Sequence, residues 1–221
     1  MLPIQAGPLK GKKWIATSGK KFITGKFAPL KTKAFLDQFV PGSIFYDIGA
    51  HFGYFSAIAC SINAGKGHVY AFEPRPMNAD FFLRHMKVNG FNCFTLIQAA
   101  VSAREGEAPF NSSTGTGTGH LSPQGNITVK IISIDHQFEA GKLPAPDFIK
   151  IDVEGGEMEV LKGCEKVIST CHPKLLIATH GLTNHEFVIH FLNQHGYSYE
   201  VLNKDGIKGD TEIIALPNNL L

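Results

Sequence analysis

Short apolar runs alternate with amphipathic stretches along most of the chain from residue 44 onward. Apolar runs of four to eight residues bounded by turn residues predict buried strands, and apolar residues at helical spacing predict helices. This alternation is typical of repeated βα units around a largely parallel sheet. The expected strands lie within 44–49, 67–74, 94–101, 145–156 and 174–180, and the expected helices within 54–63, 77–90, 156–170 and 185–196.

Two regions depart from this rhythm. Residues 1–43 are expected to form a lysine-rich leader and a cap, with a helix over 30–40, whereas 44–221 form one domain. Residues 102–126 are rich in small polar side chains and are expected to form a long loop, which in a compact domain is usually functional or disordered. The tail predicts two closing strands, 197–203 and 211–217, around the Gly- and Asp-rich turn 204–210.

Composition is ordinary for one soluble globular domain. The chain has 221 residues, of which 43% are hydrophobic and 18% charged. No run of about 18 apolar residues predicts a membrane span, and the N-terminus lacks the apolar centre of a secretory signal. The four cysteines are scattered without a CxxC pair, which favours reduced thiols. The expected location is the cytoplasm.

Charge is unevenly spread although the net charge is only +2. Residues 1–33 hold eight lysines and no acidic residue. Such a basic arm can contact nucleic acid or an anionic substrate, whereas the plainer interpretation is a solvated, partly mobile leader. The lysines come without the aromatic residues of a nucleic-acid platform, so nucleic acid is not the expected partner.

The stretch FYDIGAHFGYFS at 45–56 carries the first functional signal. A strand ending at Asp47-Ile48-Gly49 turns through Gly53 into a helix, which lets the backbone approach a ligand and offers free N–H groups. The spacing is neither GxGxxG nor the phosphate loop with its lysine. Glu73, at the end of the second strand, can accept hydrogen bonds from both hydroxyls of a ribose. These residues predict a nucleoside cleft.

The segments FYDIGAHFGYFS, VYAFEPRP, LIQAAVS and DFIKIDVEGGEMEVLKG, in this order, resemble the FkbM-type family of S-adenosylmethionine-dependent methyltransferases. The resemblance runs from about Phe22 to Leu216. It implies an α/β, Rossmann-like sheet of seven strands in the order 3-2-1-4-5-7-6, with the last strand antiparallel and helices on both faces. It implies S-adenosylmethionine as cofactor, with S-adenosylhomocysteine as product. The expected cofactor-binding residues are Asp47, Gly49, His51, Gly53, Glu73, Pro74, Gln98, Ala99, Ala100 and Asp152.

The fourth strand and the end of the fifth carry the expected catalytic residues: Asp152, Glu154 and His180. Charged residues of a central parallel strand gather at its carboxyl end, where the acceptor must approach the sulfonium methyl. A neutral His180 could remove a proton from a hydroxyl acceptor. In the plainer alternative, Glu154 caps the following helix and Lys150 pairs with Asp152.

The resemblance therefore implies a methyltransferase that O-methylates a hydroxyl of a small molecule or saccharide. A divalent metal held by the same three side chains is a lesser alternative, because hard cations favour oxygen ligands. Two other functions stay open: a non-catalytic cofactor-binding partner protein of the same fold, and an RNA methyltransferase. The absence of an NPPY-type tetrapeptide after the fourth strand disfavours the latter. An oligomer is compatible with the pattern but not required by it.

Overall fold

A seven-stranded sheet forms the centre of the computed structural model, which describes residues 1–113, 115–203 and 210–218. The strands are parallel except β13, which is antiparallel to both of its neighbours. Numbered by chain order, they read 3-2-1-4-5-7-6 across the sheet. The α/β fold class expected from the sequence is confirmed. In spatial order the strands are β5 (Phe94–Ile97), β4 (His68–Phe72), β3 (Ile44–Ile48), β10 (Phe148–Ile151), β11 (Lys174–Thr179), β13 (Thr211–Pro217) and β12 (Tyr197–Val201).

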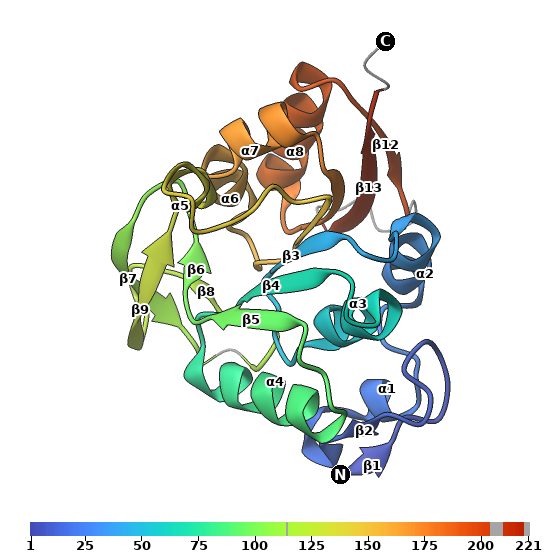
Figure 1. The fold of residues 1–221 in the computed structure, drawn as a ribbon. Helices are drawn as coiled ribbons and strands as arrows, with labels where there is room; N and C mark the ends of the chain where they lie inside the picture. The colour runs from blue at the N-terminus through green and yellow to red at the C-terminus, as the bar shows by residue number, and fades with distance from the viewer. Residues whose placement is uncertain (114, 204–209, 219–221) are drawn as a thin grey trace.

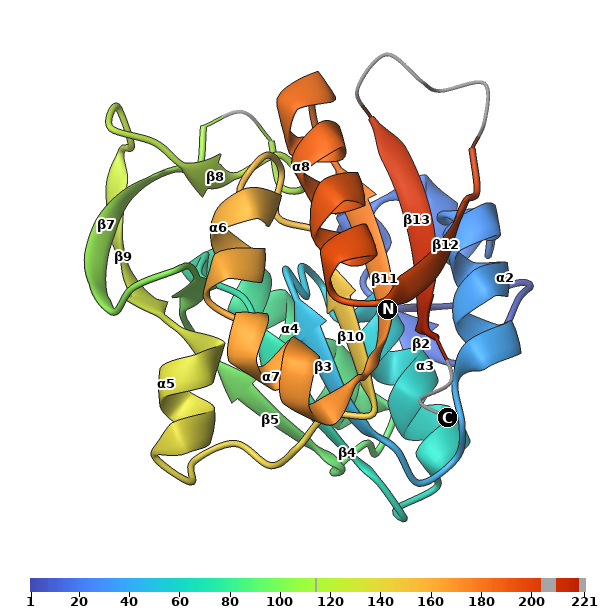
Figure 2. The same cartoon turned by 90° about the horizontal axis from the view of Figure 1, so that it is seen from above.

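Helices cover both faces of this sheet (Figures 1 and 2). Successive side chains of a strand point to opposite faces, so one strand feeds two cores. In β10, Phe148 joins the cluster under α2 and α3, whereas Ile149 and Ile151 join the cluster under α6, α7 and α8. One face carries α2 (Pro29–Gln38), α3 (Tyr54–Asn63) and α4 (Pro76–Val88), and the other α5 (Ile134–Glu139), α6 (Glu157–Lys162), α7 (Glu165–Cys171) and α8 (Leu182–Gln194).

A second, four-stranded sheet replaces the long loop expected at 102–126. Its strands, in spatial order, are β6 (Ala100–Val101), β9 (Ile127–Ile132), β7 (Gly106–Asn111) and β8 (His120–Leu121). The prediction of one loop was wrong because β7, GEAPFN, contains glycine and proline, which weaken a strand pattern. The expected third strand, 94–101, was also wrong as one element: β5 ends at Ile97, and the chain then enters the second sheet.

The N-terminal region is packed on the core instead of forming a solvated leader. Its elements are β1 (Leu2–Pro3), β2 (Lys13–Trp14), a short 3-10 helix (Ala16–Ser18) and α1 (Lys20–Ile23), followed by α2. Leu9 and Trp14 are fully buried, and both belong to the cluster beneath α3 and α4. The interpretation as a mobile leader was wrong because these few apolar side chains anchor a segment whose lysines dominate its sequence.

Two other predictions concern the helix expected after β10 and the two strands expected at the end of the chain. The expected helix 156–170 is two helices, which end and begin on either side of Gly163 and Cys164. Only glycine fits at 163, because a Cβ there would lie 2.1 Å from the carbonyl oxygen of Ser102. The two closing strands are confirmed as the antiparallel pair β12 and β13, while most of the expected turn, 204–209, lies outside the described residues. Within the described ranges, no helix is long and apolar enough to cross a membrane.

Candidate active site

A cavity of about 360 Å³ opens at the carboxyl ends of β3, β4 and β10. This is the edge at which open α/β sheets bind ligands, and the volume lies in the range of roughly 300–1,000 Å³ typical of small-molecule sites. Eight of the site residues predicted from the sequence line this cavity: Gly49, His51, Glu73, Pro74, Ala99, Ala100, Asp152 and Glu154. Asp47, Gly53, Gln98 and His180 are not among the lining residues.

Asp47 lies beneath the cavity and shapes the turn above it. Its side chain is fully buried, with Oδ1 3.0 Å from Lys150 Nζ and Oδ2 accepting from the backbone N–H and the hydroxyl of Ser56. Lys150 Nζ also donates to the carbonyl of Gly49 at 2.9 Å. The pair therefore ties the end of β3 to β10, and the expected pairing of Lys150 with Asp152 was wrong.

The two glycines of the turn have different neighbours. Gly49 has φ +76°, and a Cβ there would lie 1.9 Å from the backbone oxygen of Asp152, so only glycine allows the ends of β3 and β10 to approach this closely. Gly53 has φ +84°, but its α-carbon faces Phe82 of α4, where a Cβ would approach to 2.6 Å. Packing against α4, not the cavity, explains the second glycine.

Glu73 ends β4 with its side chain 5% exposed. Oε2 accepts from the His51 N–H at 2.8 Å, and Oε1 accepts from the Arg75 N–H at 2.9 Å and from Asn78 Nδ2 at 3.2 Å. Burial raises the pKa of Glu73, while the hydrogen bonds from Arg75, His51 and Asn78 oppose the rise. A carboxylate offers about four acceptor positions, so three donors leave room for a ligand hydroxyl.

The second sheet covers the cavity from above. Its loop contributes Thr116, Gly117 and Gly119 to the lining, and β8 contributes His120 and Leu121. The loop is held from α4 by two hydrogen bonds: Arg75 Nη1 donates to the carbonyl of Gly115 at 2.6 Å, and Asn78 Nδ2 donates to that of Thr116 at 3.0 Å. Because Asn78 also bonds Glu73, the floor and the cover of the cavity share one side chain.

Asp152 is tied to the N-terminal region. Lys31 Nζ of α2 lies 2.9 Å from Asp152 Oδ2 and 3.2 Å from Glu212 Oε1 of β13. Although burial alone would raise the pKa of Asp152, the charges of Lys31 and Lys150 outweigh it and hold that pKa well below its usual range. Asp152 is therefore ionised and is a weak base.

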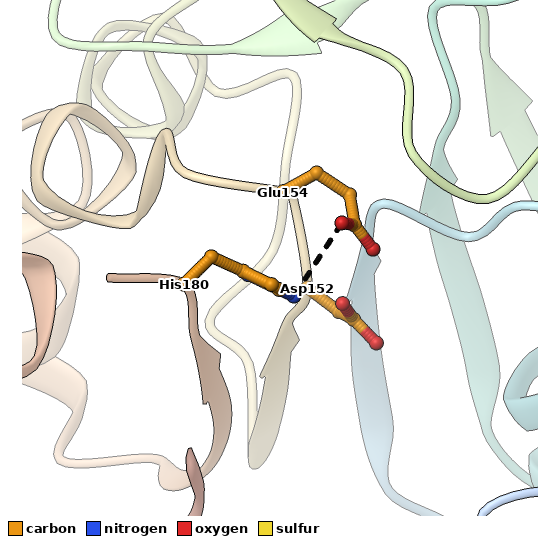
Figure 3. Close-up of side chains that lie close together, drawn as sticks. All are labelled: Asp152, Glu154 and His180. Atoms are coloured by element: carbon orange, nitrogen blue, oxygen red, sulfur yellow. Dashed lines mark ion pairs between the residues drawn. The ribbon is translucent and has the colours of Figure 1, made fainter. Parts of the chain in front are cut away.

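His180 follows β11 and lies near three carboxylates. Two of them, Asp152 and Glu154, are drawn in Figure 3. Nδ1 of His180 is 2.9 Å from Oε1 of Glu157, and its Nε2 is 3.6 Å from Oε2 of Glu154. Burial alone would lower the pKa of His180, but the hydrogen bond with Glu157 and the charges of Glu154, Glu157 and Asp152 outweigh it and raise the pKa to about 9. The expectation of a neutral imidazole was therefore wrong for the ligand-free protein at neutral pH.

Donor atoms of Asp152, Glu154 and His180 all lie within 4.8 Å of one another, a spacing that suits one small cation. The surroundings fit that alternative poorly. Lys31 already occupies one oxygen of Asp152, and the nearby carboxylates hold a proton on the imidazole. Glu154 does not cap α6 either, because no side chain caps that helix.

Sequence reasoning missed three residues at the site: Lys31, Asn78 and Glu157. In the sequence, Lys31 belongs to a lysine-rich segment and Glu157 to the first turn of a helix, where solvent exposure is the normal expectation. Neither a lysine-rich segment nor an acidic first turn indicates that the side chain forms an ion pair or hydrogen bond with a residue distant in the sequence. Lys31 lies 121 positions before Asp152, and Glu157 lies 23 positions before His180.

Two comparisons with known proteins, one with a family model and one with a related sequence, both match methyltransferases. A model described as the methyltransferase FkbM domain matches residues 47–199. A hexuronic acid methyltransferase, AglP of Haloferax volcanii, is 31% identical over 176 residues, which cover 77% of this chain and 70% of the relative.

Solved structures share the fold. The crystal structure of methyltransferase FkbM from Methylobacillus flagellatus KT matches with a TM-score of 0.60 and 23% identity, covering 78% of this chain and 43% of that one. This chain thus spans less than half of that protein. Aeropyrum pernix fibrillarin, crystallised with natively bound S-adenosyl-L-methionine, matches with a TM-score of 0.54 and 14% identity, covering 84% of this chain and 74% of that one.

Proposed function

The chain belongs to the FkbM family of S-adenosylmethionine-dependent methyltransferases, and on that premise we propose that it methylates a hydroxyl oxygen of a sugar or a sugar-like small molecule. The observation that carries the acceptor class is the 31% identity to a hexuronic acid methyltransferase over most of both chains. The cavity at the carboxyl edge of the sheet supplies the matching site.

We propose that the cofactor lies across this edge with its ribose on Glu73 and its adenine beside Pro74, Ala99 and Ala100. These residues line one end of the cavity, and Glu73 retains an acceptor position for a hydroxyl. The methionine part would follow the turn at Gly49 and His51. Gln98 is exposed and outside the lining, so it has no part in this proposal.

The acceptor would then enter beside Asp152 and Glu154, with His180 as the base. Transfer from a sulfonium is an in-line displacement, so alignment of the acceptor oxygen with the methyl carbon and exclusion of water provide most of the rate increase. A hydroxyl acceptor gains from proton removal, and His180 is the better candidate because the lysine-bound Asp152 is too weak a base.

The first test is calorimetric titration of S-adenosylhomocysteine into the wild type, Glu73→Ala and Glu159→Ala. Both glutamates line the cavity, but only Glu73 is at the expected ribose position. We expect Glu73→Ala to weaken binding by about 10- to 100-fold, the usual loss of a hydrogen bond to a charged group, and Glu159→Ala to change it less than threefold. Equal affinities would show that the ribose is elsewhere.

The acceptor is tested with labelled methyl donor and a panel of neutral hexoses and hexuronic acids. Methylation of a hydroxyl gives an ether that resists mild alkali, whereas methylation of a carboxylate gives an ester that alkali cleaves. We expect alkali-stable label. An alkali-labile product would show that the acceptor is a carboxylate and not a hydroxyl. Methylation of a carboxylate needs no base.

Binding of cofactor without transfer to any sugar would favour the non-catalytic alternative. Salt-sensitive RNA binding that depends on the lysines of residues 1–33 would favour the RNA alternative. A cytoplasmic location is part of the proposal, supported by four cysteines that are all free thiols. A divalent metal and an oligomer stay predictions from the sequence.

A further inference from the structure

Glu157 is an unusual carboxylate for its position in the chain. It is the first residue of α6, a place where acidic side chains normally face water, yet it is fully buried. A buried carboxylate needs hydrogen-bond donors to offset its lost hydration. Two donors meet at Oε1: the N–H of Gly155 at 3.0 Å and Nδ1 of His180 at 2.9 Å.

This contact determines how the imidazole is oriented. A carboxylate only accepts hydrogen bonds, so Nδ1 must carry a proton, and Nε2 is left on the side of Glu154. The backbone around the ring is also fixed, because Asn184 Nδ2 donates to the carbonyls of both His180 and Gly155, at 2.9 and 3.0 Å. Figure 3 shows the ring directed toward Asp152 and Glu154.

We propose that Glu157 is a positioning residue for proton transfer, which keeps His180 with Nδ1 protonated and Nε2 facing the acceptor. This inference rests on the proposed function. The transfer starts from the neutral ring, after Nε2 has released its own proton to solvent. The oxygen–hydrogen bond of the acceptor then breaks and its proton goes to Nε2. The oxygen forms a bond to the methyl carbon, and the carbon–sulfur bond breaks with its electron pair left on sulfur.

The charged groups around the imidazole come from three parts of the fold. Glu157 belongs to α6, Asp152 and Glu154 follow β10, and Lys31 of α2 lies behind Asp152. Among the charged residues that the structure describes, Glu157 alone contacts Nδ1. Replacing it with glutamine keeps the shape of the side chain and removes its charge, so His180 loses both a fixed orientation and some of its basicity.

The test compares Glu157→Gln with Glu165→Gln, the first residue of the next helix, α7, whose carboxylate is exposed and lies 3.4 Å from Nε2 of His195. We expect Glu157→Gln to lower kcat by about 10- to 100-fold with little change in the KM for the cofactor, as loss of an orienting carboxylate does elsewhere. The acid limb of the kcat profile should also move to lower pH. Glu165→Gln should leave both unchanged.

A purely structural role for Glu157 predicts a different result. In that case Glu157→Gln would lower thermal stability and leave the acid limb of the kcat profile unchanged. The ring resonances of His180, followed by NMR, would titrate in the variant as they do in the wild type. Unchanged kcat and an unchanged acid limb in Glu157→Gln overturn the inference. If that variant does not fold, His180→Gln is compared with the wild type: an acid limb retained without His180 also overturns it.

Failure of the proposed function gives a separate result. In that case the wild type does not bind S-adenosylhomocysteine, and the role of Glu157 falls with it. If the wild type and Glu157→Gln bind the product equally well and only the variant loses turnover, both proposals stand. A double variant, Glu157→Gln with His180→Gln, should then be no slower than His180→Gln alone, because residues that act as one unit are not additive.

Discussion

Glu154 holds its carboxylate beside His180 from a backbone conformation that only glycine adopts freely. Its φ is 58°, in the left-handed region, where a side chain costs about 1–2 kcal/mol. Burial raises the pKa of this carboxyl, and the nearby Asp152 and Glu157 add to the rise while His180 opposes it. The residue is thus unfavourable for stability in its backbone and in its charge, as is common at functional sites.

Replacing Glu154 with glycine should therefore stabilise the fold while impairing transfer. We expect the free energy of unfolding to rise by up to about 1 kcal/mol, because relief of strain exceeds the added chain entropy of glycine, and activity to fall at least tenfold. Denaturant unfolding and a transfer assay measure the two effects. Glu154→Ala is the matched control, since it removes the charge but keeps the strain. Equal stability of the two variants would contradict this account.

Substitution in the buried pair of Asp47 and Lys150 should instead destabilise the fold. Lys150→Met leaves Asp47 charged and without its cation in a dry site, which typically costs about 3–5 kcal/mol. The double variant Asp47→Asn with Lys150→Met should recover much of that loss. Lys162→Met, which breaks an exposed pair with Glu159, should change stability by less than about 0.5 kcal/mol. Denaturant unfolding of the four proteins measures the pattern, and a double variant no better than Lys150→Met would contradict it.

At the scale of elements, His85 of α4 is one of the side chains that attach the N-terminal region to the core. The fully buried ring of His85 stacks on Trp14 with centroids 3.7 Å apart. Its Nε2 accepts the N–H of Ile15 at 3.1 Å, and its Nδ1 lies 2.9 Å from the carbonyl of Phe52. A ring that accepts at Nε2 and donates at Nδ1 must be neutral, so protonation removes the contact with the N-terminal region.

This attachment predicts a loss of stability in acid. Burial lowers the pKa of His85 to about 4, below the value of about 6.5 in an unfolded chain. The unfolded state therefore binds the proton first, and the contribution to stability is lost as pH falls from about 6.5 to about 4, by up to about 3 kcal/mol. Denaturant unfolding at pH 7.5, 5.5 and 4 measures it.

Burial also lowers the pKa of His51, so the loss of stability in acid does not come from His85 alone. A matched variant is therefore needed. The difference in stability between the wild type and His85→Asn isolates the contribution of His85, and it should shrink as the pH falls. His190→Gln, an exposed position on α8, should show no such trend. A difference that does not depend on pH would show that His85 has the same pKa in the folded and unfolded states, which would contradict the prediction.

Some of these elements were predictable from sequence, and the reasons differ from one element to another. The strands of the main sheet are short apolar runs, so their pattern indicates them directly. The strand β7 was not recognisable, because Gly106 and Pro109 interrupt it. Glu73 was placed by its position after a strand, whereas Glu157 and Lys31 act through partners that no local pattern specifies. Sequence periodicity indicates which face a residue occupies, but not what lies opposite.

At the scale of the whole molecule, the charged side chains that line the cavity are acidic. Glu73, Asp152, Glu154 and Glu159 line it, and no lysine or arginine does so within the described ranges. The methyl donor is a sulfonium cation, and the product left after transfer is a neutral thioether. An acidic site therefore binds the donor more tightly than the product and helps the product to leave. The same charge disfavours a carboxylate on the acceptor near these side chains, which favours methylation at a hydroxyl.

This change in charge should also control the proton on His180. In the ligand-free protein, burial alone would lower the pKa of His180, but Glu157, Glu154 and Asp152 raise it to about 9, so the imidazole is charged at pH 8. A sulfonium bound beside Asp152 and Glu154 adds a positive charge, which lowers the pKa of His180 and releases part of its proton. S-adenosylmethionine should then release protons on binding at pH 8, whereas S-adenosylhomocysteine should release few. Calorimetry in phosphate and in Tris, whose heats of ionisation differ, counts the protons.

The matched variant for this experiment is His180→Gln, in which the two ligands should release the same number of protons. Equal release by both ligands in the wild type would mean that the sulfonium does not bind near His180, and the assignment of the acceptor side would be wrong. The expected difference has a catalytic consequence. Cofactor binding would create the base just before transfer, and loss of the sulfonium charge on transfer would restore the high pKa, so the proton taken from the acceptor would stay on His180 until the product leaves.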